Sequence, residues 1–465
     1  METPGDLRLV FFTGPGIAPL EVYGCPVLEL LLMQRTDIAE LLVRVRGLAL
    51  FRGIRDAPAV QHYLTLLEAL SQERPDADLV AGTFGRLWKE LSLGSESLLP
   101  DAWQSYLVGC ILDDENSFTL GVERGAMNNL LMNQACLELR TLRSLFELDA
   151  GITFDLIDSA LPGLTEMWVP WSKQDPAEDS ARRTIAQKLA GIDDWGVCAE
   201  LLADYYARNG AGSFGRYQAF RWGDGRIQPV PHPDPVRLAE LIGYDAEQEQ
   251  LIRNTRRLIT GLPSHHVLLY GLPGTGKSST VKALVNEYSD NGLRLVEVSK
   301  DDLRDLSAVL HELQSRGPSF IVFIDDLSFE EHEVEYKSLK ALLQGSVEEP
   351  PANVRIYATS NRRNLIRESF SDRDEVGSDD VHARDTMQEK LSLAARFGLR
   401  VTFPAPDQRE YLTIVRGLVQ IRNIKISDEE LTERALFWDQ WHAGRSGRSA
   451  RQFVLDLEAD LAEDQ

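Results

Sequence analysis

The arrangement of apolar and polar positions divides the chain into two halves with different periodicities. In the first half, from about residue 21 to about residue 209, apolar residues recur at spacings of three and four, as in the segments 27–45, 128–148 and 198–209. This spacing is typical of helices that bury one face and expose the other. We therefore expect a mostly α-helical N-terminal domain at residues 1–211, whose apolar stripes form its core.

The period changes after a stretch rich in glycine and proline. Residues 212–236 contain both residue types repeatedly, and because neither continues a helix well, we predict a linker there. Beyond it, short apolar runs alternate with helical stretches. These runs lie at 267–271, 293–299, 320–326, 354–361 and 399–403. Such alternation indicates a parallel five-stranded sheet flanked by helices, an α/β core that we place at residues 237–405.

The last segment, residues 406–465, is helical again. Asp407 followed by Glu410 forms a capping pair at the start of its first helix, because each side chain can bond the other residue's backbone N–H. The sequence therefore predicts three folded parts joined by one linker.

The composition narrows the class of protein without defining a fold. A chain of 465 residues is too long for one ordinary core, and 49 basic against 72 acidic residues give a net charge of −23. That charge disfavours non-specific binding to nucleic acid. Four cysteines without metal-binding spacing fit a reducing compartment. The chain's first residues lack the pattern of a signal peptide and no apolar run is long enough to span a bilayer, so we expect a cytoplasmic protein without membrane insertion.

A phosphate-binding motif follows the first apolar run of the α/β part. Residues 271–278 read GLPGTGKS and fit G-x-x-x-x-G-K-[ST], with a predicted strand before and a helix after. Glycine lets the backbone N–H groups turn toward a phosphate chain at a helix N-terminus. Lys277 would reach the β- and γ-phosphates of ATP, and the Ser278 hydroxyl would bind Mg²⁺. We predict that the nucleotide contacts Gly271, Leu272, Pro273, Gly274, Thr275, Gly276, Lys277, Ser278 and Ser279.

Two carboxylates end the third apolar run, 320–326. Asp325 is placed to hold the Mg²⁺ shell through water, so Ser278 and Asp325 are the predicted metal residues. Asp326 follows directly and could polarise the attacking water. A P-loop followed by such a strand, at the spacing of one βαβ crossover, predicts a nucleotide-hydrolysing site.

The order of motifs resembles a known family. The segments GLPGTGKSS, LVEVSKDDL, FIDDLSFEEHEVEYKSLKALLQGSVEEPPANVRIYATSNRR and EKLSLAARFGLRVTFPAPDQREYL are similar to a bacterial family of poorly characterised AAA+ ATPases, catalogued mainly as a domain of unknown function. The similarity covers roughly residues 216–465, and the FIDDLSFEE signature is particular to it. It implies an AAA+ P-loop module with a C-terminal helical lid, ATP and Mg²⁺ as cofactors, and ATP hydrolysis.

The resemblance also implies roles for residues outside the phosphate loop. Asn361 matches the first AAA+ sensor, which hydrogen-bonds the attacking water or the γ-phosphate. Arg396 matches the arginine finger, which reaches a neighbouring subunit's nucleotide. Arg451 matches the second sensor on the lid, with Arg448 as the alternative. Together with the motif reading, this predicts as catalytic residues Lys277, Asp326, Asn361 and Arg396.

The resemblance also concerns the segment around adenine and the catalytic base, and for the base it leaves an alternative open. Ile242 and Gly243 lie in a segment that looks like the one packing around adenine. The family of AAA+ proteins usually has glutamate where Asp326 stands, and Asp326 is one methylene shorter. Glu330 or Glu331 is therefore an alternative catalytic base.

Three functions fit these motifs. The first is an oligomeric ATPase, a homo-oligomeric ring such as a hexamer, that remodels a protein client held by the N-terminal domain. The second is an ATP-operated switch or scaffold with slow hydrolysis, which the Asp326 departure favours. The third is a DNA-acting loader or initiator, which the net charge of −23 disfavours. Residues 299–313 lack an aromatic–apolar–glycine loop, which counts against polypeptide threading.

Overall fold

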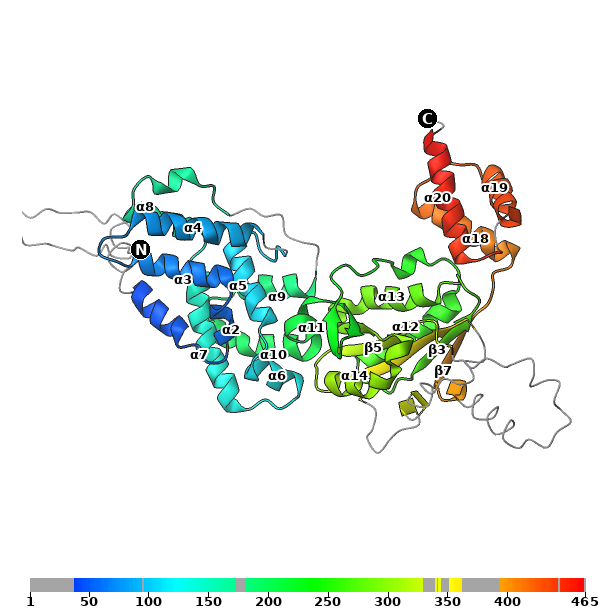
Figure 1. Cartoon of the computed structure of the whole chain (residues 1–465), viewed down its shortest axis with the longest axis horizontal. Coiled ribbons are helices and arrows are strands. Elements are labelled where there is room, and N and C mark those ends of the chain that lie inside the picture. The colour runs from blue at the N-terminus through cyan, green and yellow to red at the C-terminus, as the bar shows by residue number, and fades with distance from the viewer. Residues whose placement is uncertain are drawn as a thin grey trace, which may run out of the picture. The chain divides into compact units, whose positions relative to one another are not determined.

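A computed structural model describes most of the chain (Figure 1). The described residues are 37–93, 96–171, 180–328, 339–340, 342–343, 351–361, 393–441 and 444–463. They form two compact units, Met1–Gly121 with Ala126–Asp204 and Val122–Gly125 with Tyr205–Gln465.

The N-terminal unit is helical, and buried apolar side chains form its core. Residues 37–46 are helical, and the helices that follow are α2 (Arg52–Arg55), α3 (Pro58–Leu70), α4 (Ala77–Ser92), α5 (Ala102–Asp113), α6 (Ser117–Glu123), α7 (Asn129–Phe146), α8 (Ala150–Ala160), η1 (Leu164–Met167), α9 (Ala181–Ala190), η2 (Trp195–Val197) and α10 (Cys198–Asn209). The last residues of α6 and α10 belong to the second unit. Tyr63 stacks on Trp103 with ring centroids 4.0 Å apart, and both side chains are fully buried.

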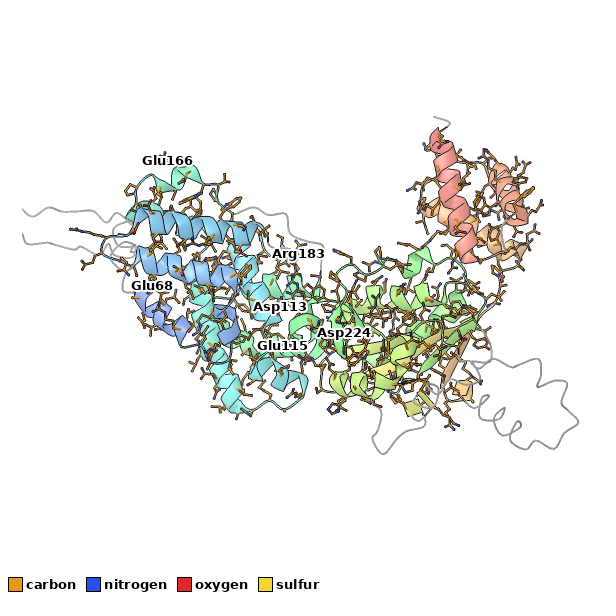
Figure 2. The ribbon with its side chains drawn as sticks, viewed as in Figure 1. Glu68, Asp113, Glu115, Glu166, Arg183 and Asp224 are labelled. Atoms are coloured by element: carbon orange, nitrogen blue, oxygen red, sulfur yellow. The ribbon has the colours of Figure 1, made fainter. Side chains whose placement is uncertain are left out.

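Two charged groups buried in this unit, Glu138 and Arg182, have partners within it. The carboxylate of Glu138 accepts hydrogen bonds from the backbone N–H groups of residues 49–51. Arg182 donates to Glu96 and to Asp113. Asp113, the last residue of α5, is labelled in Figure 2. Internal partners offset the cost of removing these two charges from water. Their burial therefore needs no functional explanation.

The second unit contains a mostly parallel sheet of seven strands in the order β2-β1-β4-β5-β6-β3-β7. Every neighbouring pair is parallel except β1–β2. The strands are β1 (Ala219–Gly223), β2 (Arg226–Pro229), β3 (Val267–Gly271), β4 (Leu293–Glu297), β5 (Ser319–Ile324), β6 (Val354–Ser360) and β7 (Leu399–Phe403). The last five correspond to the five apolar runs of the sequence.

The predicted linker contributes the other two strands, so the expected count of five was wrong. Residues 212–236 contain a short helix, α11 (Gly212–Arg216), followed by β1 and β2. Phe220 and Trp222 are buried, and Ala219 pairs with Leu295 of β4. Asp224 and Gly225 have positive φ angles, which suits a tight hairpin turn. Glycine here marks a turn at the edge of the sheet.

Helices cover both faces of the sheet. On one face pack α12 (Asp245–Ile259) and α13 (Lys277–Tyr288), and on the other packs α14 (Leu306–Leu313). Alternate residues of β5 serve the two faces, with Phe323 in one core and Val322 in the other. This alternation is the period of two expected of a strand buried on both sides. Short 3₁₀ turns join these elements at η3 (Leu238–Glu240), η4 (Ser289–Asn291) and η5 (Lys300–Asp305).

Three helices follow β7 in the segment that we predicted to be a lid and call the lid below: α18 (Gln408–Ile421), α19 (Asp428–Trp441) and α20 (Gly447–Glu463). Their apolar faces meet in a core of their own that includes Tyr411, Val415 and Phe453. The predicted capping box is confirmed, since Asp407 accepts from the Glu410 N–H and Glu410 accepts from the Asp407 N–H. Within the described residues, no helix has both the length and the apolar character that crossing a membrane requires.

Candidate nucleotide-binding site

The strand order gathers the predicted site residues at one edge of the sheet. Strand β6 lies between β5 and β3, and all three run parallel. Their carboxyl ends therefore meet, which is where ligands bind in open parallel sheets. The phosphate loop follows β3, Asp325 and Asp326 follow β5, and Asn361 follows β6.

The phosphate loop needs glycine for two different reasons. Gly274 and Gly276 have φ angles of +80° and +91°, which side chains with a Cβ adopt only at a cost. At Gly271 a Cβ would lie 2.0 Å from the backbone oxygen of Phe403 on β7. Gly271 is thus fixed by contact with the neighbouring strand, and the loop leads into α13 at Lys277.

Lys277 lies inside the loop and is largely buried. Its ammonium donates to the backbone oxygens of Gly271 and Leu272 at 2.9 and 2.8 Å, and to Asn361 Oδ1 at 3.1 Å. Burial lowers the pKa of Lys277, whereas Asp325 and Asp326 act in the opposite direction. A phosphate oxygen, carrying a full charge, is a better acceptor for this ammonium than a neutral carbonyl.

Oxygen atoms that could bind a metal ion lie close together beside Lys277. Ser278 Oγ donates to Asp325 Oδ1 at 2.6 Å, and the Thr359 hydroxyl donates to the same oxygen at 2.5 Å. Mg²⁺ is commonly held by one carboxylate and a hydroxyl together with nucleotide phosphates. The donor set formed by Ser278 and Asp325 therefore fits Mg²⁺.

Asp326 has an uncommon backbone conformation, with φ at +50°. Its N–H donates to Thr359 Oγ1 at 2.9 Å, and its carboxylate accepts from Asn361 Nδ2 at 2.7 Å. Asn361 also accepts from Lys277, so one side chain joins the phosphate loop to the end of β5. Non-glycine residues with positive φ are found more often where function requires a particular orientation.

Thr359 is a residue that the motif reading missed. It is 1% exposed on β6, and its hydroxyl connects Asp325 to the backbone of Asp326. Threonine is also an ordinary strand residue, so nothing in the run YATSN distinguishes this hydroxyl from one that only packs. The signal that could have found Thr359 is its position two residues before Asn361, because residues two apart on a strand point to the same face of the sheet.

These groups line a cavity of about 530 Å³, a volume within the usual range of small-molecule sites. Within the part of the chain that is described, its lining is Glu240, Leu241, Ile242, Tyr244, Gln248, Pro273, Gly274, Thr275, Gly276, Lys277, Ser278, Ser279, Thr280, Asp325, Asp326, Thr359, Asn361, Ile414, Leu418, Gly447, Arg448 and Arg451. Most of the predicted nucleotide residues are among them. Gly243, Gly271, Leu272 and Arg396 are not.

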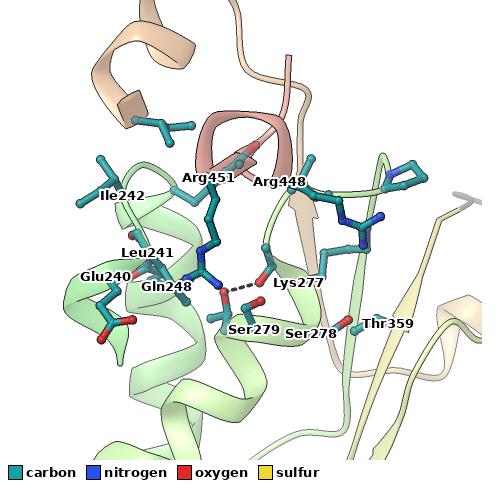
Figure 3. Close-up of a pocket in the computed structure, with 18 of the residues that line it drawn as sticks. Glu240, Leu241, Ile242, Gln248, Lys277, Ser278, Ser279, Thr359, Arg448 and Arg451 are labelled. Atoms are coloured by element: carbon teal, nitrogen blue, oxygen red, sulfur yellow. Dashed lines mark hydrogen bonds between the residues drawn. The ribbon is translucent and has the colours of Figure 1, made fainter. Parts of the chain in front are cut away.

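Both candidate sensor arginines lie on the lid wall of the cavity. Figure 3 shows Arg451 extending from α20 toward the first turn of α13, with Arg448 beside it. The two residues are three positions apart on one helix, so they share a face. The backbone N–H of Arg448 also donates to the Gly274 oxygen at 3.0 Å, which joins the lid directly to the phosphate loop.

The other end of the cavity is more apolar. Ile242 faces lid residues Ile414 and Leu418 across this end, and Gly417 leaves no space for a Cβ beside Ile242. Gln248 on α12 holds the preceding segment by donating to the backbone oxygens of Leu241 and Gly243. Sequence reasoning named Ile242 and missed Gln248, because a glutamine in a helix is usually a surface residue.

Residues 215–461 match the family described as "Protein of unknown function (DUF815)". The chain belongs to the DUF815 family. The match covers the sheet, the phosphate loop and the lid, and it begins just before β1.

Relatives of this DUF815 protein are named as replication, branch-migration and nucleotidase proteins. It is 23% identical over 235 residues to the replication factor C large subunit of Staphylothermus marinus, covering 48% of this chain and 46% of the relative. It is 28% identical over 175 residues to the Holliday junction branch migration complex subunit RuvB of Staphylococcus haemolyticus, covering 37% and 48%. It is 26% identical over 220 residues to the proteasome-activating nucleotidase of Pyrococcus abyssi, covering 44% of each.

The matches are partial. The DUF815 chain spans less than half the length of each of these three relatives. Among solved structures, the Thermotoga maritima RuvB Holliday junction branch migration motor matches 49% of this chain and 66% of its own, with 19% identity and a TM-score of 0.34. The three sequence matches support the resemblance to AAA+ ATPases.

Arg396 is not among the described residues that line the cavity of this DUF815 protein. It follows the helical residues 393–395 in a turn before β7 and is partly buried. The alternative bases Glu330 and Glu331 lie outside the described residues. Asp326 therefore remains the predicted base on the described strand end.

Proposed function

We propose that this DUF815 protein binds ATP with Mg²⁺ and hydrolyses it as an AAA+ ATPase. The observation that carries the proposal is the hydrogen-bonded chain Lys277–Asn361–Asp326 at the wall of the cavity. A purely structural glycine turn has no need of a lysine, an amide and a carboxylate joined across three separate elements. Relatives named as a nucleotidase and as replication factor C subunits support the same class.

The phosphates would lie on the N-terminal end of α13. Backbone N–H groups of Gly274 and Gly276 and the positive end of the helix dipole favour anions there. Lys277 would exchange a neutral carbonyl partner for a charged phosphate oxygen. The base and ribose would extend toward Ile242, where the cavity is apolar.

Ser278 and Asp325 would hold the metal together with phosphate oxygens. Mg²⁺ bound there would neutralise charge on the transferring phosphoryl group. Thr359 fixes the Asp325 carboxylate by a hydrogen bond, so that this oxygen is oriented before nucleotide arrives.

Asp326 and Asn361 would orient the attacking water. The Asp326 carboxylate is aligned by Asn361 Nδ2, and a carboxylate at this position can accept the water's proton as the oxygen attacks phosphorus. Steady-state hydrolysis tests this role. Turnover that survives in Asp326→Ala would remove Asp326 from the mechanism and would leave residues 330–331 as the candidates.

The arginine finger would act between subunits. Arg396 does not line the cavity of its own chain among the described residues, as expected of a side chain that completes a neighbour's site in a homo-oligomeric ring. Mixing Arg396→Ala with Lys277→Ala subunits tests this arrangement, because each mutant supplies what the other lacks. We expect partial recovery of activity, whereas no recovery from two variants that still assemble would contradict the role of Arg396 as a finger acting between subunits.

The work done by hydrolysis is proposed to be remodelling of a protein client held by the helical N-terminal unit. The decisive measurement is particle size with and without a non-hydrolysable ATP analogue, followed by turnover. A strict monomer in both conditions would contradict the ring, and tight binding with turnover near zero would favour the ATP-operated switch.

A DNA-acting ATPase is the second candidate, because relatives are named RuvB and replication factor C. The net charge of −23 argues against it, since binding to DNA depends on neutralising phosphates with lysine and arginine. Retention on duplex DNA at about 0.15 M salt, lost as salt rises, would support this candidate.

A further inference from the structure

The lid carries a second hollow, away from the nucleotide cavity. It has a volume of about 730 Å³ and lies between α19 and α20. We call it the aromatic groove, and define it by its lining residues Glu430, Glu433, Arg434, Phe437, Trp438, Trp441, Phe453, Asp456, Leu457 and Asp460. It shares no residue with the nucleotide cavity.

The aromatic groove exposes side chains that a solvent-facing helix surface normally lacks. Phe437 is 63% exposed and Trp441 is 74% exposed, with ring centroids 6.0 Å apart. They are four residues apart on α19 and therefore lie on one face. Below them Trp438 packs against Phe453 with centroids 5.9 Å apart, so the exposed rings continue a packed aromatic floor.

The rim of the groove is acidic. Four carboxylates, Glu430, Glu433, Asp456 and Asp460, stand around it. The one arginine in the lining, Arg434, is paired with Glu430 at 2.8 Å and lies 3.9 Å from Asp460. The rim therefore retains negative charge beside exposed aromatic rings.

We propose that the aromatic groove binds a short basic amphipathic segment of a partner protein. The aromatic floor would take an apolar anchor, and the carboxylates would pair with lysine or arginine on either side of it. Helix-in-groove recognition commonly uses such anchors spaced three and four residues apart, and aromatic side chains often carry much of the binding energy. This proposal is independent of the nucleotide chemistry.

Charge selects this occupant over two others. A second copy of the chain carries the same net charge of −23, so it matches an acidic rim less well than a basic segment does. Nucleic acid would bring phosphates against four carboxylates. A basic segment gains from both features of the groove, and steering by opposite charge also speeds its association.

The test is direct binding of designed peptides to the full chain by fluorescence anisotropy. The probe is a labelled peptide of about 18 residues with leucines on one helical face and lysines and arginines on the flanks. A matched peptide keeps the leucines and carries glutamates instead. We expect the basic peptide to bind and the acidic peptide to fail, with affinity falling as salt rises because the rim charges are screened.

Variants locate the binding to the groove. Trp441→Ala removes an exposed ring without opening a core. It should weaken binding by about tenfold or more, as loss of a hot-spot residue does. Glu433→Lys should weaken it several-fold and flatten the salt dependence. Matched controls are Leu455→Ala and Glu429→Lys, exposed residues on α20 and α19 that do not line the groove; both should bind as the unaltered chain does.

Three results would overturn the proposal. One is equal binding of the basic and acidic peptides. Another is Trp441→Ala binding the basic peptide as tightly as Leu455→Ala does. The third is self-association of the unaltered chain without peptide that Trp441→Ala abolishes, because the groove would then receive a second copy.

Discussion

The two ends of strand β3 carry polar clusters that are built in opposite ways. At its amino end, the closed cluster satisfies its polar groups internally; it comprises Asn254, Thr255, His266 and Tyr357. At its carboxyl end, the open cluster lines the cavity; it comprises Lys277, Ser278, Asp325, Asp326 and Asn361.

The closed cluster is held by reciprocal bonds around buried side chains. Asn254 accepts from the His265 N–H and donates to Tyr357 Oη at 3.0 Å. The same phenol exchanges a 2.8 Å hydrogen bond with Thr255. His266 Nδ1 accepts from the Ile356 N–H. These groups join α12 and β6 to the start of β3.

The difference lies in where the hydrogen-bonding capacity points. In the closed cluster it is consumed inside the protein, which stabilises the fold. In the open cluster, carboxylate and ammonium groups border a cavity, so a ligand can compete for them. Polar residues at the ends of one strand thus indicate a binding site only where their partners can be exchanged. The following predictions separate effects on activity from effects on stability.

Lys277→Ala should have the largest effect on activity. Loss of the ammonium removes a charge that would face the phosphates, so ATP turnover should fall by on the order of 10²–10³. The melting temperature should change little, because Lys277 is bonded mainly to its own loop. Lys282→Ala, on the same helix α13 but outside the cavity, is the control. A variant that hydrolyses ATP normally would contradict the assigned site.

Asn254→Ala should have the opposite signature. It removes one of the two hydrogen-bond partners of the buried Tyr357 phenol and the acceptor of the His265 N–H, which should cost about 1–3 kcal/mol of unfolding free energy. Turnover per folded molecule should be unchanged. Gln250→Ala, on the exposed side of α12, is the matched control for chemical denaturation. A loss of turnover per folded molecule would contradict the division into a closed and an open cluster, because it would show that Asn254 also acts on the nucleotide site.

Thr359→Val should lower turnover by roughly 10–100-fold, because it keeps the shape of the side chain and removes the hydroxyl that orients Asp325. The Mg²⁺ concentration needed for half-maximal activity should rise. Thr359→Ser retains the hydroxyl and should restore most of the activity. If valine and serine variants behave alike in a magnesium titration, the hydroxyl has no positioning role.

Arg451→Ala and Arg448→Ala should separate the two candidates for the lid sensor. Both arginines line the cavity, and loss of one charge-assisted contact should weaken ATP binding by about tenfold. We expect the larger loss for Arg451→Ala and measure it by titration with a fluorescent ATP analogue. The reverse order would assign the sensor to Arg448.

The smallest effect concerns pH. Burial, assisted by the charge of Arg355, lowers the pKa of His266 from 6.5 to about 4. Between these values the unfolded chain binds a proton that the folded chain does not. The contribution of His266 is therefore complete above pH 6.5 and is lost as pH falls toward 4, by up to about 1.4 kcal/mol per pH unit.

His266→Asn tests this dependence, since an amide oxygen can replace Nδ1 as the acceptor for the Ile356 N–H and does not titrate. We expect the free energy of unfolding of the variant to fall less steeply than that of the unaltered chain between pH 6.5 and 4. Parallel curves in denaturant titrations would contradict the buried neutral histidine.

The sequence predicted the open cluster better than the closed one. The spacing of glycine, lysine and serine in residues 271–278 predicts phosphate binding, and the apolar run before Asp325 places this carboxylate at a strand end. Thr359 could not be recognised, because a strand threonine that orients a carboxylate looks like one that only packs. Likewise Asn254 is an ordinary helix residue until Tyr357, distant in sequence, is brought beside it by the fold.

The edge of the sheet was missed for a related reason. The pairing of β1 with β4 joins residues more than seventy positions apart, and local composition gives no sign of such a partner. Glycine and proline density in 212–236 predicts only where the chain turns. It does not distinguish a flexible connection from a hairpin whose Phe220 and Trp222 are buried.

The contact between Gly271 and Phe403 joins the phosphate loop to the strand that leads into the lid. The two residues are paired in register at the ends of β3 and β7, and no room exists between them for even a methyl group. Phe403 lies four residues before Asp407, which caps the first lid helix. The phosphate loop and the lid thus begin at the ends of two paired strands. We therefore expect a shift of the Gly271 backbone to displace Phe403, because these two residues are in close contact.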